Sequence, residues 1–169
     1  PVPPPDRPRQ PIAQVPPTTA PRHSATDYRA LAAQNLYDPV LPNFRHAATD
    51  AADAPIAQAQ QAFSAGNYEQ TLRQLAQADS THSQTTAFLA AHALFRLGRF
   101  GEAAEQFAAL AAQRSRQYRY AAEWGLLLCR MAELPEQEAA FRQQLDALLA
   151  QPEHPYSEQA KALELGIRN

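Results

Sequence analysis

Residues 96–107 read RLGRFGEAAEQF and place a glycine inside an alanine-rich helical pattern. Glycine in a helix interior costs roughly 1 kcal/mol relative to alanine. At the end of a helix, by contrast, glycine readily takes the positive φ that closes the last turn. We therefore expect one helix to end at Gly98 and the next to begin at Phe100.

The same break occurs elsewhere in the chain. Gly66 marks an earlier break of this kind, and a third break lies around residues 134–136. No stretch alternates polar and apolar residues with period two, so no strand is predicted. The pattern predicts an all-α fold with helices over residues 50–65, 68–78, 83–97, 100–113, 118–132, 136–150 and 156–165.

Helical hairpins that recur about every 34 residues resemble tetratricopeptide repeats, and the spacing from Gly66 to Gly98 is close to that length. The hairpin around Gly98 has the expected small Ala91, aromatic Phe100, and then Ala103 and Phe107 in its second helix. The earlier hairpin follows the pattern more loosely, through Ala59, Gly66, Tyr68, Thr71, Leu75 and Ala78. The resemblance implies an α-solenoid of about three helical hairpin repeats with a C-terminal capping helix. The alternative is a helical bundle without a repeat.

Composition divides the chain into three parts. Residues 1–26 are dense in proline, which fixes φ and removes a backbone donor, so they are predicted to be a disordered or extended linker. Residues 27–49 are expected to form a short helix and an extended segment that packs on the domain. Residues 50–169 are expected to form the solenoid, with Asp50 or Asp53 capping its first helix and Pro135 in the first turn of its sixth.

The overall composition limits the function classes. With 169 residues the chain is long enough for one domain with its own core. Its formal net charge is −2, which argues against a nucleic-acid partner because such binding needs a basic patch. No run approaches the 18 or more apolar residues of a membrane span. The chain begins with proline, so we expect it to be part of a longer protein.

The sequence contains no recognisable catalytic or metal-binding motif. Cys129 is the single cysteine and lies among apolar residues, which predicts a buried thiol. The five histidines lack the spacing of a zinc site. Glu102 and Glu105 fit a solvated helix face. We therefore predict no catalytic residue, metal or cofactor, and an enzyme of unrecognised type is kept as an alternative.

A hairpin stack of this kind has a concave groove lined by the first helix of each hairpin. Aromatic residues with a few polar groups suit a peptide groove, although Phe88, Phe95 and Trp124 could instead pack between helices. His92 is expected to be exposed, and residues 30–45 could occupy the groove from within. The basic run at residues 114–120 is predicted to be a solvated loop, with contact to an acidic partner as the alternative. The predicted groove residues are Gln60, Phe63, Phe88, His92, Phe95, Trp124 and Leu128.

Two stretches resemble a more particular group, the bacterial single-pass membrane proteins with an anti-sigma-factor-like cytoplasmic part and a periplasmic tetratricopeptide domain. The first is ALAAQNLYDPVLPNFR, residues 30–45, which is similar to the segment that follows the membrane helix in that group. The second is AAEWGLLLCRM, residues 121–131, with LLAQPEHPYSEQAKAL, residues 148–163. The resemblance implies a membrane anchor outside this chain and a domain on the periplasmic side of the inner membrane.

Together these features predict a non-catalytic module that binds a protein or peptide, as the periplasmic domain of a membrane-anchored regulator. One alternative is a self-associating structural domain that forms a homo-oligomer. Others are a lipoprotein-like envelope assembly factor and a cytoplasmic adaptor. No nucleic acid is expected as a partner.

Overall fold

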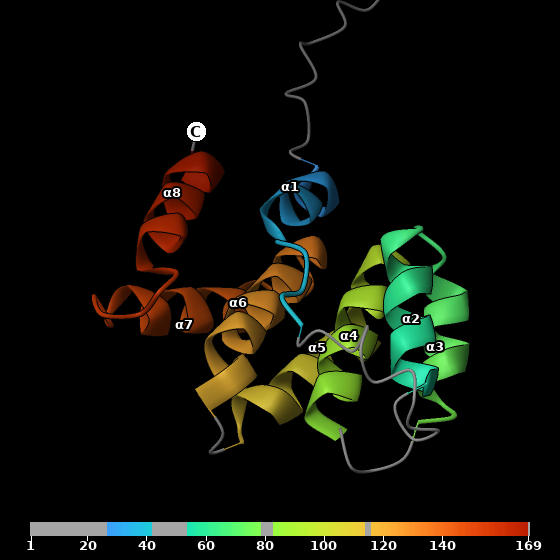
Figure 1. The fold of residues 1–169 in the computed structure, drawn as a ribbon. Coiled ribbons are helices and arrows are strands. Elements are labelled where there is room, and N and C mark those ends of the chain that lie inside the picture. Colours follow the sequence, from blue (N-terminus) through green and yellow to red (C-terminus); the bar gives the residue numbers. More distant parts are fainter. Residues whose placement is uncertain (1–26, 42–53, 79–82, 114–115, 169) are drawn as a thin grey trace, which may run out of the picture.

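The computed structural model describes residues 27–41, 54–78, 83–113 and 116–168. The predicted linker 1–26, residues 42–49 and the two candidate caps Asp50 and Asp53 lie outside the described residues. Within them the chain is all α-helical, as the sequence predicted, and has no strand (Figure 1). The helices are α1 (Tyr28–Asn35), α2 (Ala54–Ser64), α3 (Tyr68–Leu75), α4 (Ser83–Arg96), α5 (Phe100–Ala111), α6 (Arg116–Ala132), α7 (Glu138–Leu149) and α8 (Ser157–Arg168).

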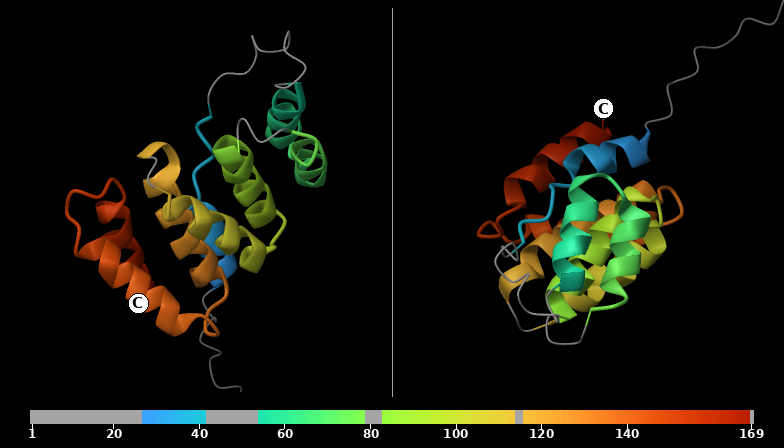
Figure 2. Two further views of the ribbon diagram at one scale, coloured as in Figure 1. Left: turned by 90° about the horizontal axis from the view of Figure 1, so that it is seen from below. Right: turned by 45° about the vertical axis from the view of Figure 1, so that its right-hand side comes forward.

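Consecutive helices from α2 to α8 pack against their neighbours and form a row of antiparallel hairpins (Figures 1 and 2). The hairpins α2–α3, α4–α5 and α6–α7 follow one another, and α8 packs against α7. The first helices of successive hairpins also touch, since α2 contacts α4 and α4 contacts α6. This is a repeat-like arrangement, in which each element is buried mainly by the next.

The two glycine turns have the same hydrogen bonds. Gly98 has φ of 75° and donates to the Phe95 carbonyl at 2.9 Å, and Arg99 donates to the Leu94 carbonyl at 2.9 Å. Gly66 has φ of 77° and makes the corresponding bond at 2.9 Å, as does the residue after it. This pair of bonds is the Schellman motif, which ends a helix with a residue in the left-handed region. Both hairpins therefore turn by the same local mechanism.

We predict that Gly98→Ala lowers the free energy of unfolding by about 1 kcal/mol, because alanine is strained at positive φ. Gly101→Ala provides a matched control nearby. Gly101 lies inside α5, and a Cβ there would meet only Glu133 Oε1 at 3.8 Å, an ordinary contact. Alanine at this position should raise the free energy of unfolding by up to about 1 kcal/mol. Urea denaturation of both variants measures the two changes, and equal effects would contradict this account of the turn.

Small residues set the spacing between the helices. Ala59, Ala91 and Ala103 are fully buried at helix contacts. Gly125 in α6 lies beneath the Phe107 ring of α5, and an added Cβ would come within 2.7 Å of that ring. Gly125 thus lets α5 and α6 approach closely enough to bury the aromatic ring.

The helix boundaries differ from the predicted ones by a few residues. The fifth predicted helix begins at Arg116 rather than at residue 118, and the last continues to Arg168. Pro135, expected in the first turn of the sixth predicted helix, instead lies in the turn before α7, which begins at Glu138. The prediction was wrong here because the turn between α6 and α7 is longer than the two glycine turns.

Helix α1 lies across α6, outside the row of hairpins (Figure 1). The Asp27 carboxylate caps it by accepting from the backbone N–H groups of Arg29 and Ala30, each at 3.1 Å. The helix ends at Asn35, and the C-cap residue Leu36 has an extended backbone. Pro39 cannot continue a helix, so the chain leaves α1 as an extended segment. We call residues 36–41 the strap.

Candidate partner groove

The strap runs between α4 and α6, across the first helices of two hairpins (Figure 2, left). At its start Leu36 is buried in the main core. At its end Leu41 packs against both the main core and the small cluster of Ala59, Leu75 and Leu89 beneath α2–α4. The chain therefore places its own extended segment along the face where the sequence predicted a partner groove.

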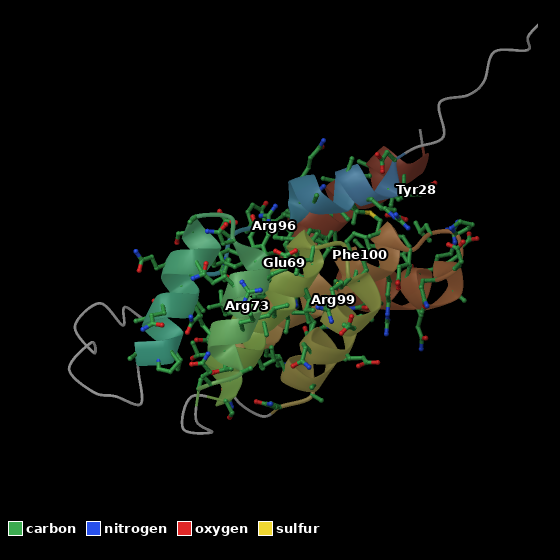
Figure 3. The ribbon with its side chains drawn as sticks, turned by 90° about the vertical axis from the view of Figure 1, so that its right-hand side faces the viewer. Tyr28, Glu69, Arg73, Arg96, Arg99 and Phe100 are labelled. Carbon is green, nitrogen blue, oxygen red and sulfur yellow. The ribbon has the colours of Figure 1, made fainter. Side chains whose placement is uncertain are left out.

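Hydrogen bonds from two helices hold the strap and the end of α1 that leads into it. The Trp124 indole Nε1 of α6 donates to the Asn35 carbonyl at 3.0 Å. Arg96, at the end of α4 and on the side where α1 crosses (Figure 3), donates from Nη2 to the Leu36 carbonyl at 3.3 Å. The same Nη2 pairs with Asp38 Oδ1 at 2.9 Å. Of these three contacts, only the one to Leu36 goes to a main-chain carbonyl of the strap, a group that any extended peptide presents. The Asn35 carbonyl belongs to the last residue of α1.

The groove floor is built from two stacked aromatic pairs. The rings of Phe88 and Tyr118 stack with centroids 4.4 Å apart, and those of Trp124 and Tyr156 stack 5.3 Å apart. Tyr118 of α6 is tied to α4 by a 3.0 Å hydrogen bond between its hydroxyl and that of Thr85. Between these pairs and the strap lies a cavity of about 170 Å³. The floor is thus aromatic, as the grooves that bind extended peptides often are.

His92 lies in this floor and lines the cavity. Its side chain is only 3% exposed, so the prediction that it would be exposed was wrong. The rings of Phe88 and Phe107 lie around it at 4.6 and 5.3 Å, because α4 turns this face toward α5. Neither ring nitrogen has a hydrogen-bond partner among the described residues. Desolvation, and secondarily the charge of Arg96, lower the pKa of His92 to about 3.

A second histidine positions the turn before α8. His154 Nδ1 accepts from the backbone N–H of Tyr156 at 3.2 Å. A nitrogen that accepts carries no proton, so Nε2 carries it and donates to Glu123 Oε2 at 3.0 Å. Arg119 pairs with the other Glu123 oxygen at 2.9 Å. This chain of contacts orients Tyr156, whose ring then covers Trp124.

The two stretches singled out by their resemblance, the second of which consists of two segments, meet at this place. Asn35 belongs to the first stretch, and Trp124 and Tyr156 belong to the two segments of the second. Trp124 contacts both of the others, through its indole N–H and its ring face. The ring of Tyr37 also lies 6.3 Å from that of Tyr156. Residues far apart in the chain therefore assemble one surface around Trp124.

The predicted groove residues divide into three sets. Phe88, His92 and Trp124 line the cavity under the strap. Gln60 and Phe63 are half-buried on α2, away from that cavity, with Phe63 against the cluster that Leu41 also contacts. The remaining two, Phe95 and Leu128, are buried in the core.

Sequence reasoning missed three residues that shape the groove. The sequence pattern assigns no role to Arg96. It places Tyr118 in the basic run and at the start of the fifth predicted helix, and Tyr156 in the turn at the start of the last one. A usable signal existed for Tyr118, because Tyr118, Ala121 and Trp124 follow one another at i, i+3 and i+6 and so form a stripe along α6.

Other candidate chemistry has a plain structural account. Burial raises the pKa of the Cys129 thiol well above its usual range. Glu102 is exposed and pairs with Arg99, which lowers the pKa of its carboxyl. Within the described part of the chain no group of three or more His, Cys, Asp or Glu side chains could hold a metal ion. Nor does any helix described there have the length and apolar character to cross a membrane.

Comparison with known proteins adds no relative, since no family model, curated protein or solved structure matches this chain.

Proposed function

We propose that this chain is a non-catalytic interaction module that binds an extended segment of a partner protein between α4 and α6. One observation carries the proposal: the chain's own strap lies there in extended form, held through the Leu36 carbonyl and the Asp38 carboxylate, next to the α1 end that Trp124 binds. A surface that binds one extended segment in this way has the hydrogen-bond donors and the apolar contacts that a second extended segment would need.

We further propose that the hairpins are tetratricopeptide-like repeats. The two glycine turns share their hydrogen bonds, and their separation is close to one such repeat. The small residues Ala59 and Ala91 occupy equivalent positions before Gly66 and Gly98, and both are fully buried. The periplasmic location and the membrane anchor stay predictions that rest on the resemblance.

Selection from a library of random peptides displayed on phage tests the binding function. Peptides enriched on the intact chain should lose about tenfold in affinity, or about 1.4 kcal/mol, on Arg96→Ala. Arg142→Ala is the matched control, because Arg142 is also a helical arginine, paired with Glu138 at 2.9 Å, but lies on α7 away from the strap. Its affinity for the same peptides should not change.

Two outcomes would contradict the proposal. The first is a selection that enriches no sequence above an unrelated helical protein. The second is a set of enriched peptides that bind Arg96→Ala and Arg142→Ala equally well, since such peptides would use another surface.

A further inference from the structure

We infer that the strap is a replaceable substitute for the partner, and that the partner segment carries the same order of groups: an apolar residue, one exposed position, a carboxylate and a proline. This inference rests on the proposed peptide-binding function and specifies the ligand. Three observations, on burial, on unpaired polar atoms and on charge, support it.

The strap is anchored at its ends and loosely held between them. Leu36 is buried and Leu41 is half-buried, but the side chain of Asp38 is 81% exposed. Tyr37 is 53% exposed and Val40 is 90% exposed. An apolar side chain left in water contributes little to binding. The middle of the strap therefore adds few contacts that would have to be lost on replacement.

The strap also leaves the groove incompletely filled. The cavity of about 170 Å³ lies between it and the aromatic floor, and His92, which lines this cavity, has two ring nitrogens without a described partner. A buried polar group without a hydrogen bond is unfavourable. A segment that follows the same path and places a hydroxyl or carboxamide in this cavity would satisfy His92, which the strap does not.

The charge at the groove specifies the carboxylate. Arg96 is mostly buried, with its side chain 25% exposed, and it pairs with Asp38 through Nη2 alone. Its Nε is buried and has no partner among the described residues. A guanidinium binds a carboxylate best through two parallel hydrogen bonds. The groove can thus hold a carboxylate more fully than the strap's own Asp38 does.

The test uses the strap sequence as a separate ligand. A fluorescent peptide of residues 35–41, NLYDPVL, is titrated into the intact chain and into the Leu36→Ala/Asp38→Ala chain, in which the strap has lost its buried side chain and its ion pair. We expect the peptide to bind the doubly substituted chain at least about tenfold more tightly. The same peptide with asparagine in place of aspartate should bind more weakly, and Arg96→Ala in the doubly substituted chain should remove this difference.

The readout separates this inference from the proposed function. Circular dichroism first establishes that the doubly substituted chain keeps its helices and a cooperative melt, and the single variant Asp38→Ala serves in its place if it does not. Equal peptide affinity for the intact and substituted chains would overturn the inference, because the strap would then not compete. Enriched library peptides that depend on Arg96, with no binding of NLYDPVL, would overturn it and leave the proposed function standing.

A second copy of the chain is the other occupant that the experiment distinguishes. If the strap of one copy filled the groove of another, the mass measured by light scattering would rise with concentration and the doubly substituted chain would be monomeric. That result would overturn the inference in favour of self-association. A mass that stays constant for both chains, together with peptide binding, supports it.

Discussion

Trp124→Ala is expected to lower the free energy of unfolding by about 3–5 kcal/mol, the range for removing a large buried aromatic side chain. Trp124 is 1% exposed, so truncating it to alanine removes a side chain whose surface is almost entirely buried. The Trp124 ring also stacks on that of Tyr156, and its indole N–H donates a hydrogen bond to the Asn35 carbonyl. Three parts of the chain therefore lose a common contact, and α1 should detach before the hairpins unfold.

Urea denaturation followed by circular dichroism measures this loss, and hydrogen exchange at the backbone amides of α1 shows where it begins. Trp124→Phe should cost less, because it keeps an aromatic ring but removes the indole N–H. Val40→Ala is the control, since Val40 lies on the same surface with its side chain almost fully exposed. A loss below about 1 kcal/mol for Trp124→Ala, far under the range for a buried aromatic ring, would show that the three parts of the chain do not depend on this contact.

Acidification should destabilise the protein through His92. Its pKa is lowered to about 3 in the fold, whereas in the unfolded chain it is about 6.5. The unfolded state therefore binds a proton below pH 6.5 that the folded state does not. The contribution of His92 to the free energy of unfolding is fully present above pH 6.5, and it is lost as the pH falls toward 3. By pH 5 the loss amounts to about 2 kcal/mol, set by the unfolded pKa because the folded ring is still neutral.

The groups around His92 act in the same direction or contribute little charge. Arg96, one helical turn away, disfavours a second positive charge. Asp38 comes from the strap but is paired with Arg96 and is exposed, and Tyr118 from α6 also lines the cavity. His92→Phe removes the titrating group while keeping an aromatic ring. The stability of this variant should therefore depend less on pH between 7.5 and 5, by the amount that His92 contributes.

Denaturation curves at the two pH values, for the native chain and for His92→Phe, give the difference directly. His154→Gln serves as the control, because it removes the other buried histidine of this region and leaves the ring of His92 in place. The carboxylates are common to the native chain and His92→Phe and cancel in that comparison. An identical pH dependence for the native chain and His92→Phe would show that His92 does not carry the effect.

The helices themselves could be predicted from the sequence because their signals are local. Gly66 and Gly98 ended helices where a left-handed residue was needed, and the absence of period-two alternation excluded strands. These features depend on backbone conformations that each residue allows within a few positions. The turn at Pro135 was placed less accurately, because no glycine marks where α7 begins.

The groove could be predicted only in part. Phe88, His92 and Trp124 were found from their register on the first helices of the hairpins. The same register also selected Phe95 and Leu128, which are buried in the core. A register gives the side of a helix, but it does not say how far the neighbouring helices cover that side.

The sequence by itself determined the helices, the two glycine turns and the extended course of the chain at Pro39. The tertiary structure decided which polar groups meet. Arg96 and Asp38 are 58 residues apart in the chain, and Trp124 and Asn35 are 89 apart. Their pairing depends on the angle at which α1 crosses α6, which the packing of many side chains sets together. The exposure of His92 was decided in the same way, by the approach of α5, and no pattern along α4 could have shown it.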